Sequence, residues 1–464
     1  MAPDRRTRSN TAVESPVTSR QSAVASQSPA DRKIVRATRL DPEASTAICA
    51  QCHSLRSVVN PDYKAGDRYY DHFVPVLEYA PVAPHASQDP PYWADGRPRR
   101  FSNDAIGLWQ SACFLRGGAT CVTCHTDPHL PDVDRNPQLG PGTSNGLCTK
   151  CHQAIGSRLT AHTRHEAASR GSACVECHMP KTVVSIKSTM RDHTMSVPAP
   201  ENTVRFNIPN ACTECHSDKP ASWAVDALKI WWPEGRRSRL VAQAEAFSAA
   251  RAGRADAIER LIAIGDDDRY PPLTRANAIG YLRNYADARA LSALTRAAKA
   301  DDPGIRATAV VGLGETGRGN PAAHAAAVDL LGDPARAVRI GSLLALLNQG
   351  GEDLSDRDVQ RFRRVGEEFV AWAHMNQQDA DLQRAEGVVH LLAGDFNRAA
   401  DALEISLDLA PGAGAARLFL AIARTGQRRF DEARALLQAI PRMDPYYEQA
   451  QERLKKLPPP GNRD

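Results

Sequence analysis

A five-residue pattern, Cys-x-x-Cys-His, occurs five times in the first half of the chain and limits what that half can be. The chain has 464 residues and 11 cysteines, and ten of these cysteines belong to the five motifs. The motifs run from Cys49 to His53, Cys121 to His125, Cys148 to His152, Cys174 to His178 and Cys212 to His216. No cysteine follows Cys215 in the sequence, so the chain divides into a cysteine-bearing part and a longer part without cysteine.

The spacing within each motif is the attachment signature of c-type haem. Both thiols add to the porphyrin vinyl groups as thioethers, and the adjoining histidine binds the iron from one side. A short helical turn at each motif would present the three groups together. We therefore predict five covalently bound haem c groups. The predicted thioether residues are Cys49, Cys52, Cys121, Cys124, Cys148, Cys151, Cys174, Cys177, Cys212 and Cys215, and the predicted proximal ligands are His53, His125, His152, His178 and His216.

Three other uses of paired cysteines explain less of the pattern. Zinc sites made of four cysteines would use the pairs two at a time, leaving a fifth pair and all five histidines unexplained. A thioredoxin-like pair normally occurs once, near a βαβ pattern. A disulfide framework accounts for the number of cysteines, but not for a histidine at the same place in every motif.

Six further histidines in the same part of the chain are candidates for the second axial ligand. They are His72, His85, His129, His162, His165 and His193. Five irons need five such ligands to become six-coordinate, and these six histidines are enough to provide them. The longer second part of the chain has only three histidines, and this contrast favours bis-histidine ligation. The sulfur alternatives in the same part are Met179, Met190 and Met195.

Five segments between Ile48 and Trp232 also carry a family resemblance. They read I-C-A-Q-C-H-S, G-A-T-C-V-T-C-H-T-D-P-H, C-V-E-C-H-M-P, R-D-H-T-M-S-V-P-A-P and P-N-A-C-T-E-C-H-S-D. These segments resemble the C-terminal haem region of multihaem c-type cytochromes related to cytochrome c-552 and c-554, in bacterial proteins that also carry helical repeats. The resemblance implies bis-histidine haems and electron transfer.

The same resemblance implies which histidines are the distal ligands. His129 in D-P-H and His193 in R-D-H correspond to distal ligands of the family, and His162 and His165 match a histidine-rich stretch. His72 matches a histidine that follows the first motif. The candidate distal ligands are therefore His72, His129, His162, His165 and His193. No counterpart of His85 can be identified.

The N-terminal residues and one cysteine depart from the family pattern. Residues 1–45 are rich in Ser, Arg, Ala and Pro, which predicts a disordered low-complexity segment, and no signal peptide can be read there. Relatives usually begin with a secretory leader, and haem thioethers form outside the cytoplasm. We therefore expect a periplasmic or otherwise extracytoplasmic location. Cys113 lies outside the motifs, and either a buried inert thiol or a reactive one would fit.

Repeated segments in the second part of the chain predict stacked helices. Three similar segments, Leu273 to Leu282, Gly304 to Leu313 and Ala337 to Leu346, resemble short HEAT-type repeats. Each contains an arginine, and these arginines are Arg275, Arg306 and Arg339. Asp-Pro pairs precede the second and third segments and are typical of a turn that starts a helix.

Further along, identical residues recur at the period of tetratricopeptide repeats. Phe396 and Phe430, like Ala399 and Ala433, are 34 residues apart. Gly387 fits the small position of a first helix in such a repeat. Units of this kind cannot bury their apolar faces alone, so they stack into a solenoid whose surface suits protein partners.

These observations predict a mainly α protein. We expect a loop-rich pentahaem cytochrome c domain followed by an α-solenoid of HEAT-like and tetratricopeptide helix pairs. The predicted parts are a disordered segment (1–45), the pentahaem domain (46–220), HEAT-like repeats (221–350) and tetratricopeptide-like repeats (351–464). A net charge of +4 gives no argument for nucleic acid, and no apolar run reaches the roughly 18–20 residues of a membrane span.

Three functions fit this architecture. The first is an electron-transfer cytochrome whose repeats dock redox partner proteins. The second is a haem-dependent reductase of a nitrogen oxyanion or similar small substrate, which requires an iron with an open position. The third is a scaffold in which the haem domain is structural. The sequence singles out no open haem, so it favours the first without deciding whether the protein is an enzyme.

Overall fold

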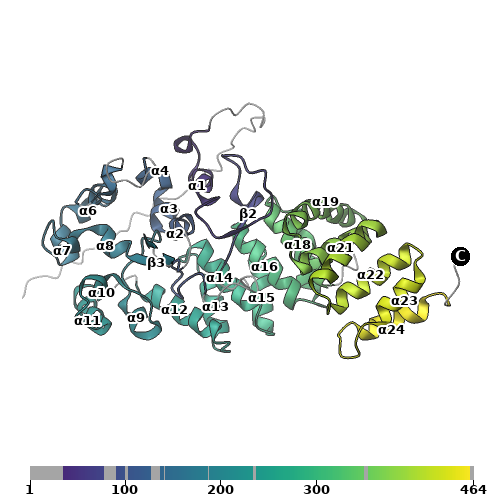
Figure 1. Ribbon diagram of the computed structural model, residues 1–464. Helices are drawn as coiled ribbons and strands as arrows, with labels where there is room; N and C mark the ends of the chain where they lie inside the picture. The colour runs from purple at the N-terminus through teal and green to yellow at the C-terminus, as the bar shows by residue number, and fades with distance from the viewer. Residues whose placement is uncertain are drawn as a thin grey trace, which may run out of the picture. The chain divides into compact units, whose positions relative to one another are not determined.

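Helices dominate the computed structural model and follow one another in chain order (Figure 1). The structure describes residues 35–77, 90–99, 103–126, 136–140, 142–185, 188–233, 237–349 and 354–459. From Ala37 onward the chain forms one unit. The expectation of a mainly α fold is therefore confirmed.

The motif-bearing region consists of short helices joined by long connections. Twenty of the 32 prolines lie in the first 220 residues, and proline disrupts helix interiors, which keeps these helices short. They are α1 (Pro42–Ala50), α2 (Asp104–Gln110), α3 (Ala112–Gly117), α4 (Cys121–Cys124), α5 (Asn145–Thr149), α6 (Gln153–Gly156), α7 (Leu159–Thr163), α8 (Cys174–His178), α9 (Pro200–Phe206) and α10 (Ala211–Cys215).

Helix α1 begins within the segment that the sequence predicts to be disordered. The Asp41 side chain accepts a hydrogen bond from the Ala44 backbone N–H at 2.9 Å, and Pro42 occupies the first helical position. This combination is a strong helix start. Ordered structure therefore begins before residue 46.

Two small antiparallel sheets complete the motif region. Strand β1 (Arg56–Val58) pairs with β2 (Phe73–Pro75), with Ser57 opposite Val74. Strand β3 (Lys181–Ser185) pairs with β4 (Ser188–Arg191), with Thr182 opposite Met190.

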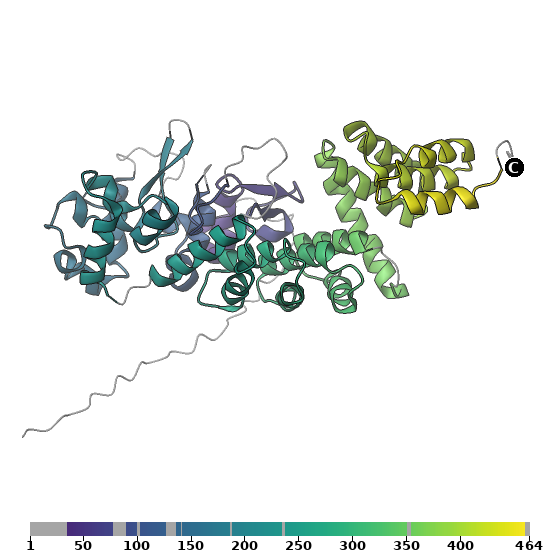
Figure 2. The same ribbon diagram turned by 90° about the horizontal axis from the view of Figure 1, so that it is seen from below.

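Longer helices build the second part of the chain, and Figures 1 and 2 show them succeeding one another. They are α11 (Ala221–Trp231), α12 (Arg237–Arg251), α13 (Ala257–Asp266), α14 (Pro272–Leu282), α15 (Ala288–Ala297), α16 (Pro303–Thr316), α17 (Pro321–Leu330), α18 (Arg336–Gln349), α19 (Asp356–Ala373), α20 (Ala380–Leu392), α21 (Phe396–Leu409), α22 (Gly414–Gly426), α23 (Phe430–Gln438) and α24 (Tyr447–Lys456). Helix α11 packs against α9 and α10, so it extends the motif region.

The repeated arginines link neighbouring repeats. The Arg306 guanidinium binds both carboxylate oxygens of Asp333 at 2.7 and 3.0 Å, and it also donates to the carbonyls of Ala300 and Asp301. Arg339 repeats this arrangement with Glu368. Arg306 and Arg339 thus each satisfy backbone carbonyls of the turn before their own helix and a carboxylate further along the chain. The third arginine of the pattern, Arg275, donates to the Gly265 carbonyl.

The motif region and the repeats share a hydrophobic core. Tyr92 and Ile106 of the motif region are 2% and 1% exposed and pack with Leu273 and Ile305 of the repeats. The Asp71 carboxylate accepts a hydrogen bond from the Arg336 backbone N–H at 3.0 Å. The repeats therefore support the scaffold of the motif region directly.

Gly387 of α20 lies where two helices approach closely, as the sequence predicts. A Cβ atom on Gly387 would come within 2.4 Å of Leu403 Cγ in α21. Gly387→Ala should therefore lower the free energy of unfolding by about 1–3 kcal/mol, in spite of the higher helix propensity of alanine. Urea unfolding checks this value. Gly412→Ala is the control, because a Cβ on Gly412 meets nothing within 4 Å. Equal effects of the two substitutions would contradict the close approach.

Candidate functional site

Each of the five motifs forms one turn of helix. The backbone N–H of the motif histidine donates to the carbonyl of the first cysteine in four motifs, at 2.8 Å for His53 and 2.9 Å for His125, His152 and His216. The fifth motif, Cys174 to His178, is helix α8 itself. The predicted helical turn is confirmed, and it brings both thiols and the histidine of each motif close together.

All eleven cysteines lie in the described part of the chain, and none of them forms a disulfide bond. The Cys49 thiolate accepts a hydrogen bond from Cys121, which lowers the pKa of Cys49 to about 7. The same contact between Cys174 and Cys148 lowers the pKa of Cys174 to about 7. The first and second motifs are therefore neighbours, and so are the third and fourth.

Three motif histidines face a histidine that the sequence predicts as a distal ligand. The ring centres of His125 and His193 are 6.3 Å apart, with an angle of 29° between the ring planes. His178 faces His162 at 6.2 Å and 19°. The third pair, His216 and His165, has its centres 6.1 Å apart at 37°. The near-equality of the three separations is the main geometric feature of the region.

Several of these histidines are oriented through Nδ1. The Nδ1 of His178 lies 2.8 Å from the Ser196 carbonyl, and the Nδ1 of His165 lies 2.6 Å from the Thr163 carbonyl. Because a carbonyl oxygen can only accept, Nδ1 carries the proton in these rings. In the neutral ring this leaves the Nε2 lone pair available to a metal, as in metal-binding histidines generally.

Burial and neighbouring charge set the protonation of the paired rings. Burial lowers the pKa of His125, and the neighbouring His193 lowers it further. Burial and the neighbouring His178 likewise lower the pKa of His162. Burial also lowers the pKa of His193, but the hydrogen bond and charge of Asp104 outweigh it and raise that pKa above its usual value. For His125 and His162, the shifts favour the neutral ring that binds metals.

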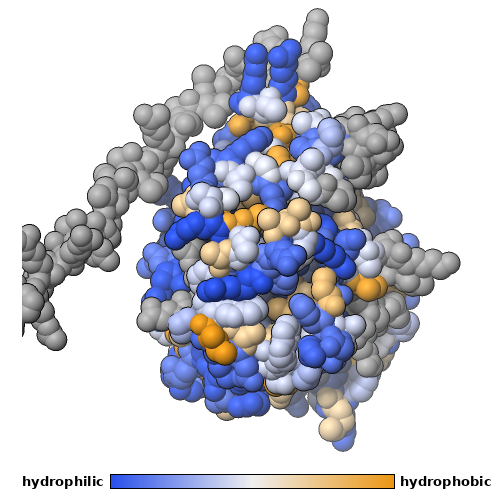
Figure 3. All heavy atoms as spheres, turned by 90° about the vertical axis from the view of Figure 1, so that its left-hand side faces the viewer, coloured by the Kyte–Doolittle hydropathy of each residue, from blue (hydrophilic) through white to orange (hydrophobic). Residues whose placement is uncertain are grey.

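Two tryptophans contact the paired histidines, one within α11 and one directly after its last residue. No sequence pattern indicated these contacts. The Trp232 ring lies 5.3 Å from the ring of His162, and the Trp223 ring lies 4.8 Å from that of His216. Trp232 is 42% exposed. Figure 3 looks from the side of α7, α10 and α11 and shows small apolar patches among polar residues.

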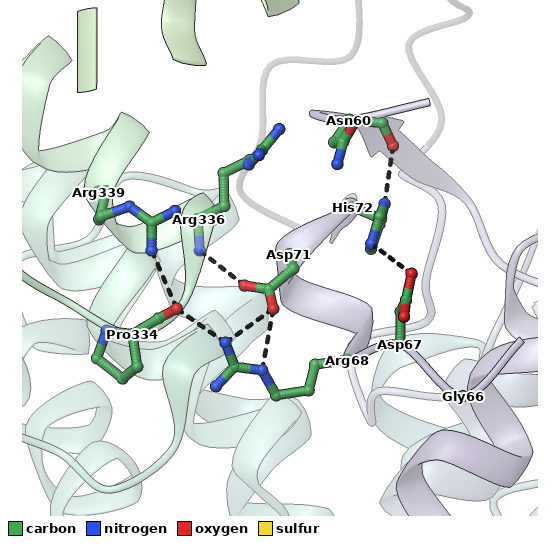
Figure 4. Close-up of a pocket in the computed structure, with 9 residues that line it drawn as sticks. All are labelled: Asn60, Gly66, Asp67, Arg68, Asp71, His72, Pro334, Arg336 and Arg339. Carbon is green, nitrogen blue, oxygen red and sulfur yellow. Dashed lines mark hydrogen bonds and ion pairs between the residues drawn. The ribbon is translucent and has the colours of Figure 1, made fainter. Parts of the chain in front are cut away.

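His72 differs from the other candidates. It lines a polar cleft of about 440 Å³ between the loop before β2 and the start of α18 (Figure 4). Its Nδ1 faces the Asn60 carbonyl at 3.2 Å, and its Nε2 faces the Asp67 carboxylate at 3.2 Å. Both ring nitrogens of His72 therefore already have an oxygen partner in the protein. Within the described ranges, the His72 ring contacts the rings of Tyr63 and Phe73.

The remaining predicted residues add less to the site. His129 and His85 lie outside the described residues. His152 is exposed. Cys113 is half-buried, and burial raises the pKa of its thiol, which disfavours the reactive thiolate.

Two further features are missing from the described ranges. There, no group of three or more His, Cys, Asp or Glu side chains could hold a metal ion by itself. In the same ranges, no helix has the length and apolar character needed to cross a bilayer.

Two stretches of the chain match known repeat families. Residues 258–348 match the HEAT repeats and residues 390–457 match the tetratricopeptide repeat. The predicted helical repeats and their order along the chain are thereby confirmed. No curated protein matches the chain.

Proposed function

We propose that the protein is a multihaem c-type cytochrome that carries electrons through five covalently bound haem c groups. The three facing histidine pairs are the main support. A metal bound by two imidazoles lies about 2 Å from each nitrogen, and each ring centre lies about 1 Å further back, which gives centres about 6 Å apart. The observed separations of 6.1–6.3 Å fit this value.

The residues around the pairs fit a porphyrin better than a metal held by side chains alone. Two histidines supply only the two axial ligands that a porphyrin leaves open, and each motif provides two thiols beside its histidine. When bound, haem iron supplies a one-electron couple. The chain itself orients the rings through Nδ1, and His125 and His193 are half-buried, which limits the access of water.

At three of the five motifs, these same pairs favour electron transfer over catalysis. A reductase of a small oxyanion requires an iron with an open position, and a histidine pair would fill both axial positions of its iron. Each pair therefore suits an iron that only gains and loses an electron. We propose that redox partner proteins dock on the helical repeats and that the protein works in the periplasm or another extracytoplasmic compartment.

The mass of the purified protein tests the proposal. Protein made in a host that matures c-type cytochromes should carry five covalent haems and give a low-spin spectrum when oxidised. The matched control replaces Cys148 and Cys151 with serine and should carry one haem fewer. Colourless wild-type protein with free thiols would overturn the proposal. A high-spin fraction that binds nitrite or cyanide would favour the reductase instead.

A further inference from the structure

One carboxylate lies between histidines of two different motif sites. Asp104 Oδ2 is 3.1 Å from Nδ1 of His53, the proximal ligand predicted for the first motif. Asp104 Oδ1 is 3.2 Å from Nδ1 of His193, which faces His125 of the second motif. The Asp104 and His193 side chains are 19% and 20% exposed, so solvent screens their contact incompletely, whereas the His53 side chain is 46% exposed.

Helix α2 holds this carboxylate in place with several independent contacts. The Ala105 backbone N–H donates to the His53 carbonyl at 3.2 Å, which ties the first turn of α2 to the first motif. A Cβ on Gly107 would lie 3.2 Å from the backbone and Cβ of His193, so this glycine allows α2 to approach that residue closely. Ile106 is 1% exposed and anchors α2 in the core shared with the repeats.

Resting on the proposed function, we propose that Asp104 is a positioning residue shared by two haem sites, where it orients His53 and His193 and lowers the reduction potentials of both irons. An Nδ1–H that donates to a carboxylate makes the ring a stronger electron donor to its metal. The negative charge also stabilises the more positive ferric iron. Both effects favour the oxidised state of the first and second haems.

A purely structural role for Asp104 predicts something different. Asp104 lies in the first turn of α2, where an acidic side chain stabilises a helix. Such a role would change the stability of the fold and would leave the potentials of folded protein unchanged. Measured potentials therefore distinguish the two roles.

Asp104→Asn in the full-length haem-loaded protein is the direct test. The asparagine has one acceptor oxygen, so His53 and His193 can no longer both face a carboxylate oxygen, and both irons lose the neighbouring charge. The Nδ1 of His193 also lies 3.0 Å from the Arg191 carbonyl, which the substitution leaves in place. In a spectroelectrochemical titration, two of the five midpoint potentials should rise. The potentials of the fourth and fifth haems should stay in place, since His178 and His165 donate to backbone carbonyls.

Two further variants keep the result interpretable. Asp226→Asn makes the same change of charge at an exposed site and should shift no potential, because the Asp226 side chain is 73% exposed. Asp104→Glu keeps the charge but cannot keep both short contacts, so smaller shifts of the same two haems are expected. If Asp104→Asn does not fold, the potentials of Asp104→Glu are measured as the test instead.

The possible results separate the inference from the proposed function. Wild-type protein without haem would overturn the proposed function and the inference with it. If the protein carries five haems and Asp104→Asn shifts none of their potentials, or only one, the shared role is wrong and the cytochrome proposal remains intact.

Discussion

His193→Ala should convert one of the five haems from low spin to high spin. The ring of His193 faces that of His125 at 6.3 Å, so the substitution removes the second axial ligand from the iron of the second motif. The other four irons keep their ligands. Electron paramagnetic resonance of the oxidised protein would show a new high-spin signal, and the covalent haem content should remain five.

His72→Ala is the informative comparison for this prediction. Because Asn60 and Asp67 hold both nitrogens of His72, we expect its removal to leave the spin state of every haem unchanged. The family resemblance implies the opposite result. A high-spin signal in His72→Ala and none in His193→Ala would contradict the pairing that the structure favours.

Arg306→Met should destabilise the repeats by about 3 kcal/mol or more. The Arg306 and Asp333 side chains are only 13% and 4% exposed, so the substitution leaves the Asp333 carboxylate buried without its cation. It also removes the donors to the carbonyls of Ala300 and Asp301. Urea unfolding followed by circular dichroism measures the loss.

Two controls show whether burial of the ion pair is the reason. Arg296→Met breaks a pair with Asp266 whose side chains are about half exposed, and it should cost at most about 1 kcal/mol. Adding Asp333→Asn to Arg306→Met should recover part of the stability, because a neutral amide is less costly to bury than an unpaired charge. Equal losses for Arg306→Met and Arg296→Met would contradict this explanation.

Local features of the fold could be predicted from the sequence. The helical turn of each motif follows from the spacing of Cys49 and His53 and its four equivalents. The small residue Gly387 and the repeated arginine Arg306 likewise occupy the positions that the repeat periods indicate. Each of these features depends on residues that are close in the sequence or that recur with a fixed period.

The pairing of the histidines could not be predicted in this way. His162 and His165 form one sequence cluster, yet they face different motifs, His178 and His216. Arg164 between them has a φ of 60°, in the left-handed region that non-glycine residues seldom adopt, and it ends α7. The two side chains therefore leave the backbone in different directions. The role of Asp104 depends on tertiary contacts, for which the sequence contains no pattern.

The core that the motif region shares with the repeats has a consequence for synthesis. A ribosome makes the five thiol pairs before it makes Leu273 and Ile305, against which Tyr92 and Ile106 are buried. Until those later residues have been synthesised, the motif region lacks part of the apolar surface against which it packs. Its cysteines should therefore stay accessible to a modifying enzyme until translation is well advanced, and completion of the solenoid would end that period.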